Sequence, residues 1–254
     1  MLVTDVKSIE YQYDVPFVVW TFWAGNAMEG NRMLSFQLLQ QHIGVPIFLV
    51  GPQNWHLLEL PAHPFHEALP LLSVVHQSDY IRIYLLHHYG GAWHDIKATE
   101  VSFAACWAQF KDPAIYMIGR KESKHGAARV HDQNGHWMPD FYEDLISVTA
   151  WVGRGGTPLS KELLHNLHLL LDENLEQLKK YPAKHPRERA LKGNNFFSRS
   201  TERIKNLFTG RSSNYPLPWT VFGNLFHPLN LKYKAHVSTD LPVNRVKNAG
   251  VYHR

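Results

Sequence analysis

A helix that runs into two glycines and then into a short strand constrains this chain more than any other feature. Residues 71–89 carry apolar side chains at helical spacing, and Gly90 follows at the position where a left-handed residue ends a helix. After Gly91, residues 92–96 (AWHDI) have the character of a strand. A helix joined so closely to a strand is expected to pack on the sheet that contains it, which favours an α/β fold.

The N-terminal part alternates strand and helix in the same way. Residues 16–22 (PFVVWTF) form the apolar, β-branched and aromatic run of a buried strand. Residues 28–42 have helical spacing of apolar side chains, Gly44 stops this helix, and residues 45–50 form a second short strand. This β–α–β order predicts two parallel strands joined by a right-handed crossover.

The second half is expected to add strands, a long loop and a strong helix. Strands are predicted at 114–118 and 145–152, and the polar segment 119–140 is predicted to be a surface loop of the kind that covers binding sites. A helix is predicted to start at Thr157-Pro158, with threonine as the N-cap. Its buried stripe consists of leucines: Leu163, Leu164, Leu167, Leu170, Leu171, Leu175 and Leu178. A short helix is expected at 219–226.

Size and composition restrict the class of protein. The 254 residues suit a single domain, and 44% hydrophobic with 19% charged residues indicates a globular chain. No apolar run approaches the roughly 18 residues that span a bilayer, and the N-terminus lacks the apolar core of a signal peptide. Cys106 is the only cysteine, so no internal disulfide forms. We therefore expect a cytoplasmic protein.

The net charge of +4 is mild and fits a phosphate-bearing small molecule, an anionic membrane surface or a nucleic acid. Many basic residues fall within an irregular stretch between residues 179 and 211. They are Lys179, Lys180, Lys184, Arg187, Arg189, Lys192, Arg199, Arg203, Lys205 and Arg211. A solvated face explains this stretch more simply than a binding surface does. If it binds a partner, we expect a lipid-linked acceptor at a membrane rather than a nucleic acid.

Two charged residues share one face of the helix that precedes the glycines. Asp79 and Arg82 are three positions apart, so their side chains are neighbours. A surface ion pair is the simpler interpretation of this spacing alone. The alternative is a pair facing a cleft, where the acid accepts from hydroxyls and the guanidinium donates to hydroxyls or phosphate oxygens. The glycine pair favours this alternative because it brings the next strand beside that face.

Asp95 lies near the end of the strand after the glycines. Alone, an aspartate there is more often a turn residue. In open α/β sheets, however, ligands bind at the carboxyl ends of strands. We therefore predict that Asp95 contacts a ligand.

The pattern S-D-x-x-R-x-x-x-L-x-x-x-G-G-x-W-x-D over residues 78–95 resembles the DXD-type sugar transferases. This group includes glycosyltransferase family 32, the capsular polysaccharide synthesis proteins and, more remotely, the clostridial glucosylating toxins. Residues 90–95 (GGAWHD) resemble the capsular branch most, and residues 19–23 (VWTFW) are similar to the family's first strand. Thr157-Pro158-Leu159 and residues 219–228 (WTVFGNLFHP) are similar to later blocks.

The resemblance implies a GT-A fold, a Rossmann-like mixed sheet flanked by helices, formed by one domain over residues 1–254. Residues 1–118 would bind a nucleotide-diphosphate sugar, most simply a UDP-sugar, and residues 119–254 would form the acceptor side. The donor-binding residues would be Trp20, Thr21, Phe22, Asp79, Arg82, Gly91 and Asp95. For Trp20 and Phe22, stacking on the base and a plain core position are equally good interpretations.

Lys97 departs from the family pattern, because it replaces the second acid of DXD, normally the direct metal ligand. A divalent cation (Mn²⁺ or Mg²⁺) is therefore in doubt. Lys97 either supplies positive charge beside the diphosphate or points to solvent. Asp95 together with His227 is the remaining candidate pair of metal ligands, since related transferases place a C-terminal histidine near the diphosphate.

These features predict a glycosyltransferase that moves a sugar from a nucleotide-diphosphate donor to a glycan or lipid-linked acceptor. Asp79, Arg82, Asp95 and Lys97 are its predicted catalytic residues. The resemblance implies retention of anomeric configuration and a role in bacterial capsule or lipopolysaccharide synthesis, with association at the inner face of the membrane. The alternative is a non-catalytic module with a transferase fold that binds a nucleotide sugar or a glycan.

Overall fold

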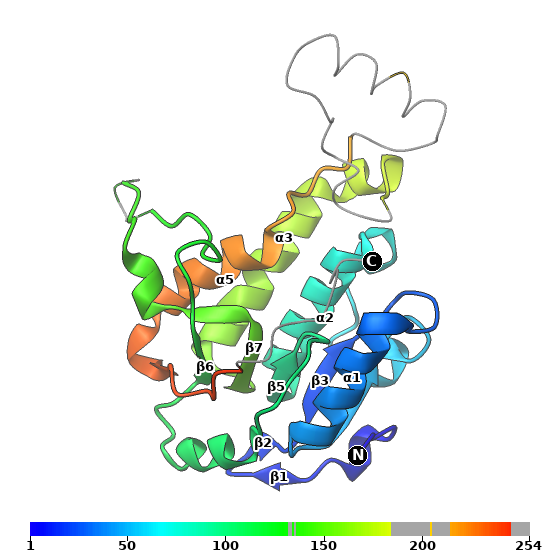
Figure 1. Ribbon diagram of the computed structural model, residues 1–254. Helices are drawn as coiled ribbons and strands as arrows, with labels where there is room; N and C mark the ends of the chain where they lie inside the picture. Colours follow the sequence, from blue (N-terminus) through cyan, green and yellow to red (C-terminus); the bar gives the residue numbers. More distant parts are fainter. Residues whose placement is uncertain (132–133, 135, 184–203, 205–213, 245–254) are drawn as a thin grey trace.

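A six-stranded mixed sheet forms the centre of the computed structural model, which describes residues 1–131, 134, 136–183, 204 and 214–244 (Figure 1). The strand order is β4-β3-β5-β7-β6-β8. The strands are β3 (Val19–Phe22), β4 (Ile47–Val50), β5 (Gly90–His94), β6 (Met117–Lys121), β7 (Ile146–Arg154) and β8 (Val237–Ser238). A separate two-stranded hairpin pairs β1 (Tyr11–Gln12) with β2 (Val15–Pro16).

The first three strands of the sheet in chain order are parallel, as the β–α–β prediction required. Strand β3 pairs in parallel with both β4 and β5, so the carboxyl ends of β3 and β5 meet at one edge. Strand β7 is antiparallel to β5 and β6, and β8 is parallel to β6. The mixed α/β architecture flanked by helices is therefore confirmed, and one sheet includes strands from both predicted halves of the chain.

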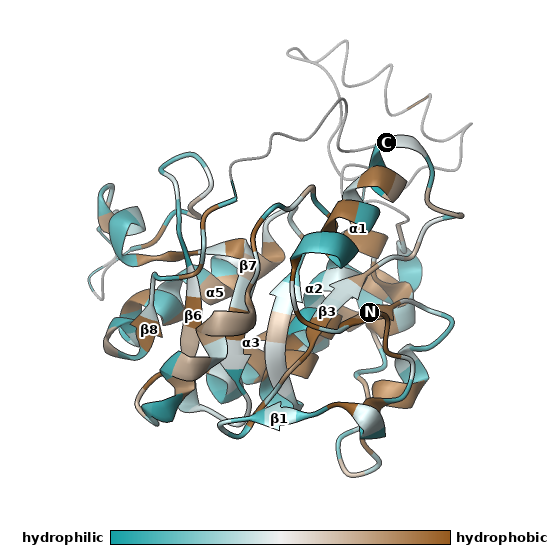
Figure 2. Ribbon diagram, turned by 60° about the horizontal axis from the view of Figure 1, so that its bottom comes forward, coloured by the Kyte–Doolittle hydropathy of each residue, from teal (hydrophilic) through white to brown (hydrophobic). Residues whose placement is uncertain are grey.

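Helices cover both faces of the sheet. They are α1 (Gly30–His42), α2 (Val74–His88), α3 (Pro158–Lys180) and α5 (Val221–Lys232). Alternate strand residues point to opposite faces, so Trp20 and Trp93 pack with α2, α3 and α5, whereas Val19 and Ala92 pack with α1 and the 3-10 helix Ala104–Lys111. The cluster that contains Val19 and Ala92 is a second hydrophobic core, and α1 has one face on it. Figure 2 shows hydrophobic and hydrophilic residues alternating along this helix.

Remaining short 3-10 helices lie in the connections. They are Val6–Ser8, Trp55–Leu58, Leu69–Leu71, Phe141–Asp144 and Lys234–His236. Within the described residues, no helix is both long enough and apolar enough to cross a membrane.

The passage from α2 to β5 follows the sequence prediction closely. Ser73 caps α2 by accepting from the His76 amide, so the helix begins at Val74 rather than at residue 71. Gly90 and Gly91 have φ values of +82° and +93°, where L residues are strained. A Cβ on Gly91 would also lie 2.9 Å from Trp20 Nε1. Glycine is therefore required at this turn by backbone conformation and by packing.

Other elements were predicted with errors at their ends. The run 16–22 is divided between the hairpin strand β2 and strand β3. The expected strand 114–118 is β6, which starts later and extends to Lys121, so the predicted loop at 119–140 begins with strand residues. Helix α3 starts after the Thr157 cap as expected, and Leu170 and Leu175 are only partly buried. Helix α5 runs beyond residue 226 and includes Pro228.

Only the first two residues of the predicted basic stretch belong to the described part of the chain. Lys179 and Lys180 end α3, and Lys179 contacts Glu176 and Glu67. The other eight basic residues of that prediction, Lys184 to Arg211, lie outside the described residues.

Candidate functional site

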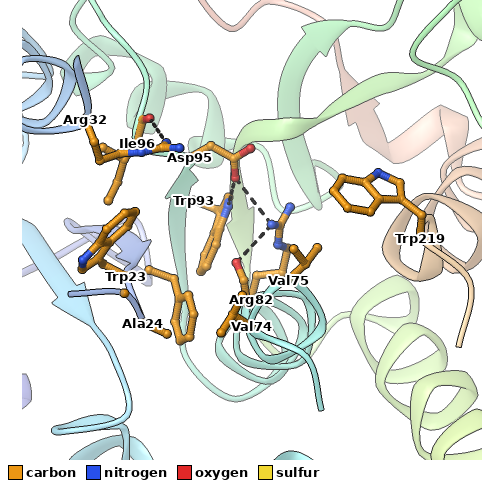
Figure 3. Close-up of a pocket in the computed structure, with 13 residues that line it drawn as sticks. Trp23, Ala24, Arg32, Val74, Val75, Arg82, Trp93, Asp95, Ile96 and Trp219 are labelled. Atoms are coloured by element: carbon orange, nitrogen blue, oxygen red, sulfur yellow. Dashed lines mark hydrogen bonds and ion pairs between the residues drawn. The ribbon is translucent and has the colours of Figure 1, made fainter. Parts of the chain in front are cut away.

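A pocket of about 380 Å³ opens where β3 and β5 end (Figure 3). Its walls come from the end of β3 and the next loop, from α1, from the first turns of α2, from the end of β5 and from Trp219. The lining residues are Phe22, Trp23, Ala24, Gly25, Arg32, Val74, Val75, Ser78, Arg82, Trp93, Asp95, Ile96 and Trp219. This is the position at which open α/β sheets bind ligands.

Asp95 lies in this pocket directly after β5, and its two carboxylate oxygens have different surroundings. Oδ1 accepts from Trp93 Nε1 at 3.0 Å and is 3.5 Å from an Arg82 terminal nitrogen. Oδ2 is 3.9 Å from Lys97 Nζ. The Asp95 backbone N–H donates to Thr149 O on β7, which fixes the residue to the sheet. With its side chain 22% exposed, Asp95 is held in place and can still accept from a ligand hydroxyl.

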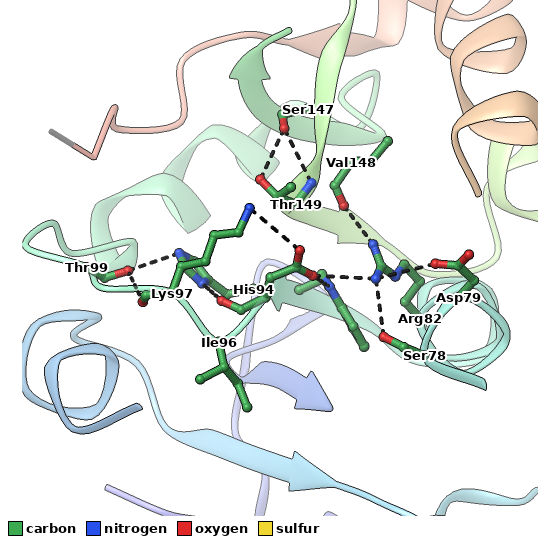
Figure 4. A network of polar contacts seen from close by, with 12 residues as sticks. Ser78, Asp79, Arg82, His94, Ile96, Lys97, Thr99, Ser147, Val148 and Thr149 are labelled. Carbon is green, nitrogen blue, oxygen red and sulfur yellow. Dashed lines mark hydrogen bonds and ion pairs between the residues drawn. The ribbon is translucent and has the colours of Figure 1, made fainter. Parts of the chain in front are cut away.

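Arg82 connects the charged residues of the site (Figure 4). Its guanidinium donates to Val148 O on β7 at 2.9 Å and to Ser78 Oγ at 3.2 Å. Its plane lies between two aromatic rings, 4.7 Å from the Trp93 centroid and 4.8 Å from the Phe222 centroid. A guanidinium fixed by this many contacts provides a positive charge of defined position at the pocket wall.

Asp79 is next to Arg82, at 3.5 Å, but it does not line the pocket. Only 5% of the residue is exposed. Burial raises the pKa of this carboxyl to about 6, against the opposing effects of Arg82 and the backbone N–H of Phe222. Asp79 is therefore not a lining residue, and its contact with a sugar donor stays a prediction.

The four donor-binding residues predicted only from the family pattern are divided between pocket and core. Phe22 lines the pocket, as expected. Trp20 and Thr21 are fully buried, and the Trp20 indole donates to Gly90 O at 2.8 Å. Of the two interpretations of Trp20, the plain core position fits the structure, because its ring packs against Phe48 and Tyr89 in the core. Gly91 is buried beneath the Trp20 ring and is not a lining residue.

Lys97 and His227 also lie outside the lining of the pocket. The Lys97 amine faces Asp95 Oδ2, so it balances the charge of that carboxylate. His227 is fully buried on α5, where Nδ1 accepts from the Ala128 amide at 3.0 Å and Nε2 is 3.6 Å from Glu122 Oε2. Its nearest acid is thus Glu122, whereas Asp95 has Arg82 and Lys97 beside it.

The surroundings of Asp95 do not fit a divalent cation. Its Oδ1 already accepts from Trp93, and the charged side chains beside the carboxylate, Arg82 and Lys97, are both cationic. Across the described residues, no group of three or more His, Cys, Asp or Glu side chains could hold a metal ion. We therefore derive no chemical step from a bound metal.

Several lining residues were not among the predicted site residues, and Arg32, Trp93 and Trp23 are the most informative of them. Arg32 on α1 donates to Ile96 O at 2.8 Å, and its guanidinium lies 5.4 Å from the centre of the Trp23 ring. Trp93 lies beneath the Arg82 guanidinium. The rule that ligands bind at carboxyl ends of parallel strands would have pointed to Trp23, which follows the first strand directly. Arg32 gives no such local signal, because only the packing of α1 brings it to the pocket.

Comparison with known proteins adds one finding. Residues 58–143 match the family model of the capsular polysaccharide synthesis proteins. The matched part is less than half of the chain, and it contains α2, β5, Arg82 and Asp95. It supports a relationship to that kind of protein and suggests a glycosyltransferase-like role. No curated protein matches the chain.

Proposed function

We propose that this protein is a glycosyltransferase that moves a sugar from a nucleotide-diphosphate sugar, most simply a UDP-sugar, to a glycan or lipid-linked acceptor. One observation carries the proposal. A partly exposed carboxylate, Asp95, and a fixed guanidinium, Arg82, meet in an aromatic-lined pocket at the ends of two parallel strands. Both residues fall in the stretch that matches the capsular polysaccharide synthesis family.

In this proposal Asp95 orients the donor. Its Oδ1 is occupied by Trp93 and Arg82, so Oδ2 is the oxygen that accepts from a sugar or ribose hydroxyl. The hydrogen bonds that hold Asp95 to β7 and Trp93 keep this acceptor in one place, and such positioning lowers the barrier to transfer. The aromatic side chains around it exclude water and offer flat surfaces for a base or a sugar ring.

Departure of the nucleoside diphosphate requires positive charge near its phosphates. Among the lining residues, Arg32 and Arg82 are the two that provide it. Guanidinium groups bind phosphate oxygens in a bidentate manner, so these residues can perform the role that a cation has in DXD enzymes. We therefore propose that transfer proceeds without a divalent cation, with retained anomeric configuration, at the inner face of the membrane during capsule or lipopolysaccharide assembly.

A panel of nucleotide sugars tests the proposal. A donor that binds the folded protein raises its melting temperature, and transfer or slow hydrolysis of the same donor would release the nucleoside diphosphate. Asp95→Asn is expected to lower this release about 100-fold or more. The matched control is Glu173→Gln, because Glu173 is an exposed acid on α3. If no nucleotide sugar raises the melting temperature, with or without Mn²⁺, the proposal is wrong.

The rival function is a binding module without catalysis. The observation that favours it is Lys97, which stands where DXD enzymes have their second acid. It predicts a donor-dependent rise in melting temperature with no release of nucleoside diphosphate, even with acceptor glycans present. Turnover by the wild-type protein that is lost in Asp95→Asn would exclude it.

A further inference from the structure

Strand β7 is irregular where it passes the candidate site. Lys121 of β6 pairs with Ile146 of β7, and the register then shifts before Gly119 pairs with Trp151. Strand β7 therefore has extra residues at 147–150, and we call this segment the β7 bulge. Bulges occur often beside binding sites, because the extra residues change the directions in which side chains point.

Two backbone carbonyls of the β7 bulge hold the charged residues of the site. Val148 O accepts from the Arg82 guanidinium at 2.9 Å, and Thr149 O accepts from the Asp95 amide at 2.9 Å. Ser147, Val148 and Thr149 are only half-buried. The bulge is therefore in direct contact with Arg82 and Asp95, and it keeps a surface that a ligand can reach.

The hydroxyl groups of Ser147 and Thr149 form a pair in the β7 bulge. Their oxygens are 3.1 Å apart, and Ser147 Oγ also accepts from the Thr149 amide at 3.4 Å. One hydroxyl proton is used between the two oxygens, so the pair can donate its second proton and can accept through its remaining lone pairs. Such a pair suits a ligand whose groups are both donors and acceptors.

Lys97 adds a positive charge that is already balanced. Its amine lies 3.9 Å from Asp95 Oδ2, and 30% of its side chain is exposed. In Figure 4 the Lys97 side chain points towards the β7 bulge. Because the charges of Lys97 and Asp95 offset each other, a neutral ligand with several hydroxyls fits here better than a phosphate does. A sugar is such a ligand.

The pocket and the β7 bulge adjoin Asp95 from different strands. Asp95 directly follows β5, and β5 lies between β3 and β7 in the sheet. The walls of the pocket come mainly from β3, α1 and α2. A donor in the pocket thus leaves the β7 side of Asp95 to a second sugar.

We propose that the β7 bulge and Lys97 form the acceptor subsite, which binds a neutral sugar through the hydroxyls of Ser147 and Thr149. The inference rests on the proposed function for the role of this sugar as the acceptor. Binding of a sugar can be measured without any donor, so the subsite and the proposed function can fail separately.

An NMR titration with the methyl glycosides of glucose, galactose, mannose, rhamnose and N-acetylglucosamine tests the subsite. At least one glycoside should shift the amide signals of residues 147–149. Thr149→Val keeps the size of the side chain and removes its hydroxyl, so it should weaken binding of that glycoside about fivefold. Thr149→Ser keeps the hydroxyl and should bind as the wild type does.

Two controls separate a direct contact from a structural effect. Ser238 is a half-buried hydroxyl residue on β8 that donates to Asp240 Oδ2, so Ser238→Ala should leave glycoside binding unchanged. UDP should bind Thr149→Val as tightly as it binds the wild type, because Thr149 does not line the pocket. Loss of UDP binding together with glycoside binding in Thr149→Val would mean that the substitution disturbs Arg82 and Asp95, and it would overturn the direct contact.

The outcomes also separate this inference from the proposed function. If no glycoside of the panel shifts the signals of residues 147–149, or if Thr149→Val binds it as the wild type does, the subsite is wrong whatever UDP does. If the wild-type protein binds a glycoside at the β7 bulge but does not bind UDP, the proposed donor is wrong and the sugar subsite is supported.

Discussion

Helix α2 has polar side chains packed at both ends, and the two ends differ in whether those side chains are charged. Between its second turn and its middle, which we call its charged end, the buried Asp79 and Arg82 form an ion pair beside the pocket. At its end, His88 packs against the rings of His63, at 4.7 Å, and Tyr84, at 4.3 Å. Burial raises the pKa of Asp79 to about 6 and lowers that of His88 to about 4.

Burial thus favours the neutral form at both ends, and the difference lies in the partners. Arg82 offsets the burial of Asp79, so this acid remains charged at pH 7. The neighbours of His88 are other histidines, His87, His63 and His168, which lower its pKa further. A charge is kept in the interior only where a fixed opposite charge meets it, and in this helix that is the end at the pocket.

The largest expected effect is that of Asp95→Asn on catalysis, because Asp95 faces Arg82 at the charged end of α2. The amide keeps the size of the side chain and loses the charge that faces Arg82 and Lys97. Release of nucleoside diphosphate should fall about 100-fold or more at saturating donor. His88→Phe, which keeps an aromatic ring at the opposite end of α2, should retain wild-type rates. Equal losses in the two variants would remove the distinction between the ends.

Arg82→Gln should cause the next largest change, in stability. It leaves Asp79 buried without its cation and removes the donor to Val148 O, so unfolding free energy should fall by about 3 kcal/mol. Urea denaturation measures this loss. Lys232→Gln breaks an exposed pair with Glu162 and should cost much less, because solvent screens that pair. A similarly small loss in Arg82→Gln would show that neither the buried pair with Asp79 nor the hydrogen bond to Val148 O on β7 contributes much to stability.

A smaller effect on stability is expected when the pH is lowered, through His88 at the C-terminal end of α2. The pKa of His88 is lower in the folded state than its usual value of 6.5, so the unfolded chain binds the proton first. Stability should therefore fall as pH drops from 6.5 towards 4. Asp79 has the opposite sign, because its raised pKa makes the folded state bind a proton between about 6 and its usual 3.8.

Melting curves at pH 7 and pH 5 measure this balance. His94, fully buried with a pKa lowered to about 4, adds to the acid loss, as do His87 and His168. The drop in melting temperature should be smaller in His88→Phe than in wild type. An unchanged drop would mean that His88 is not one of the residues that set acid stability.

The approach of Arg82 to Asp95 could be predicted from the sequence, because it depends on residues that are close together in the chain. Helical spacing, the glycine pair and the strand after it determine how Arg82 and Asp95 approach, and the structure brings them within 3.5 Å. The burial of Asp79 and Arg82 was not predictable, because it depends on how β7 and α5, which are distant in sequence, pack against α2. Trp20 and Phe22 likewise share a strand face, and only the strand end at Phe22 reaches the pocket. Arg32 and Trp219 line the pocket because segments distant in sequence pack together, which the sequence alone does not show.

The last prediction is that a chelator leaves donor turnover unchanged. Oδ1 of Asp95 is occupied by Trp93 and Arg82, and Lys97 lies 3.9 Å from Oδ2, so positive charge already surrounds this carboxylate. Donor turnover should be equal in EDTA and in Mn²⁺. Lys97→Asp restores the second acid of the DXD pattern and should make turnover rise with Mn²⁺, which isothermal titration of the metal would detect independently. A wild-type enzyme that stops in EDTA would show that a cation, and not the guanidinium groups, carries the leaving-group charge.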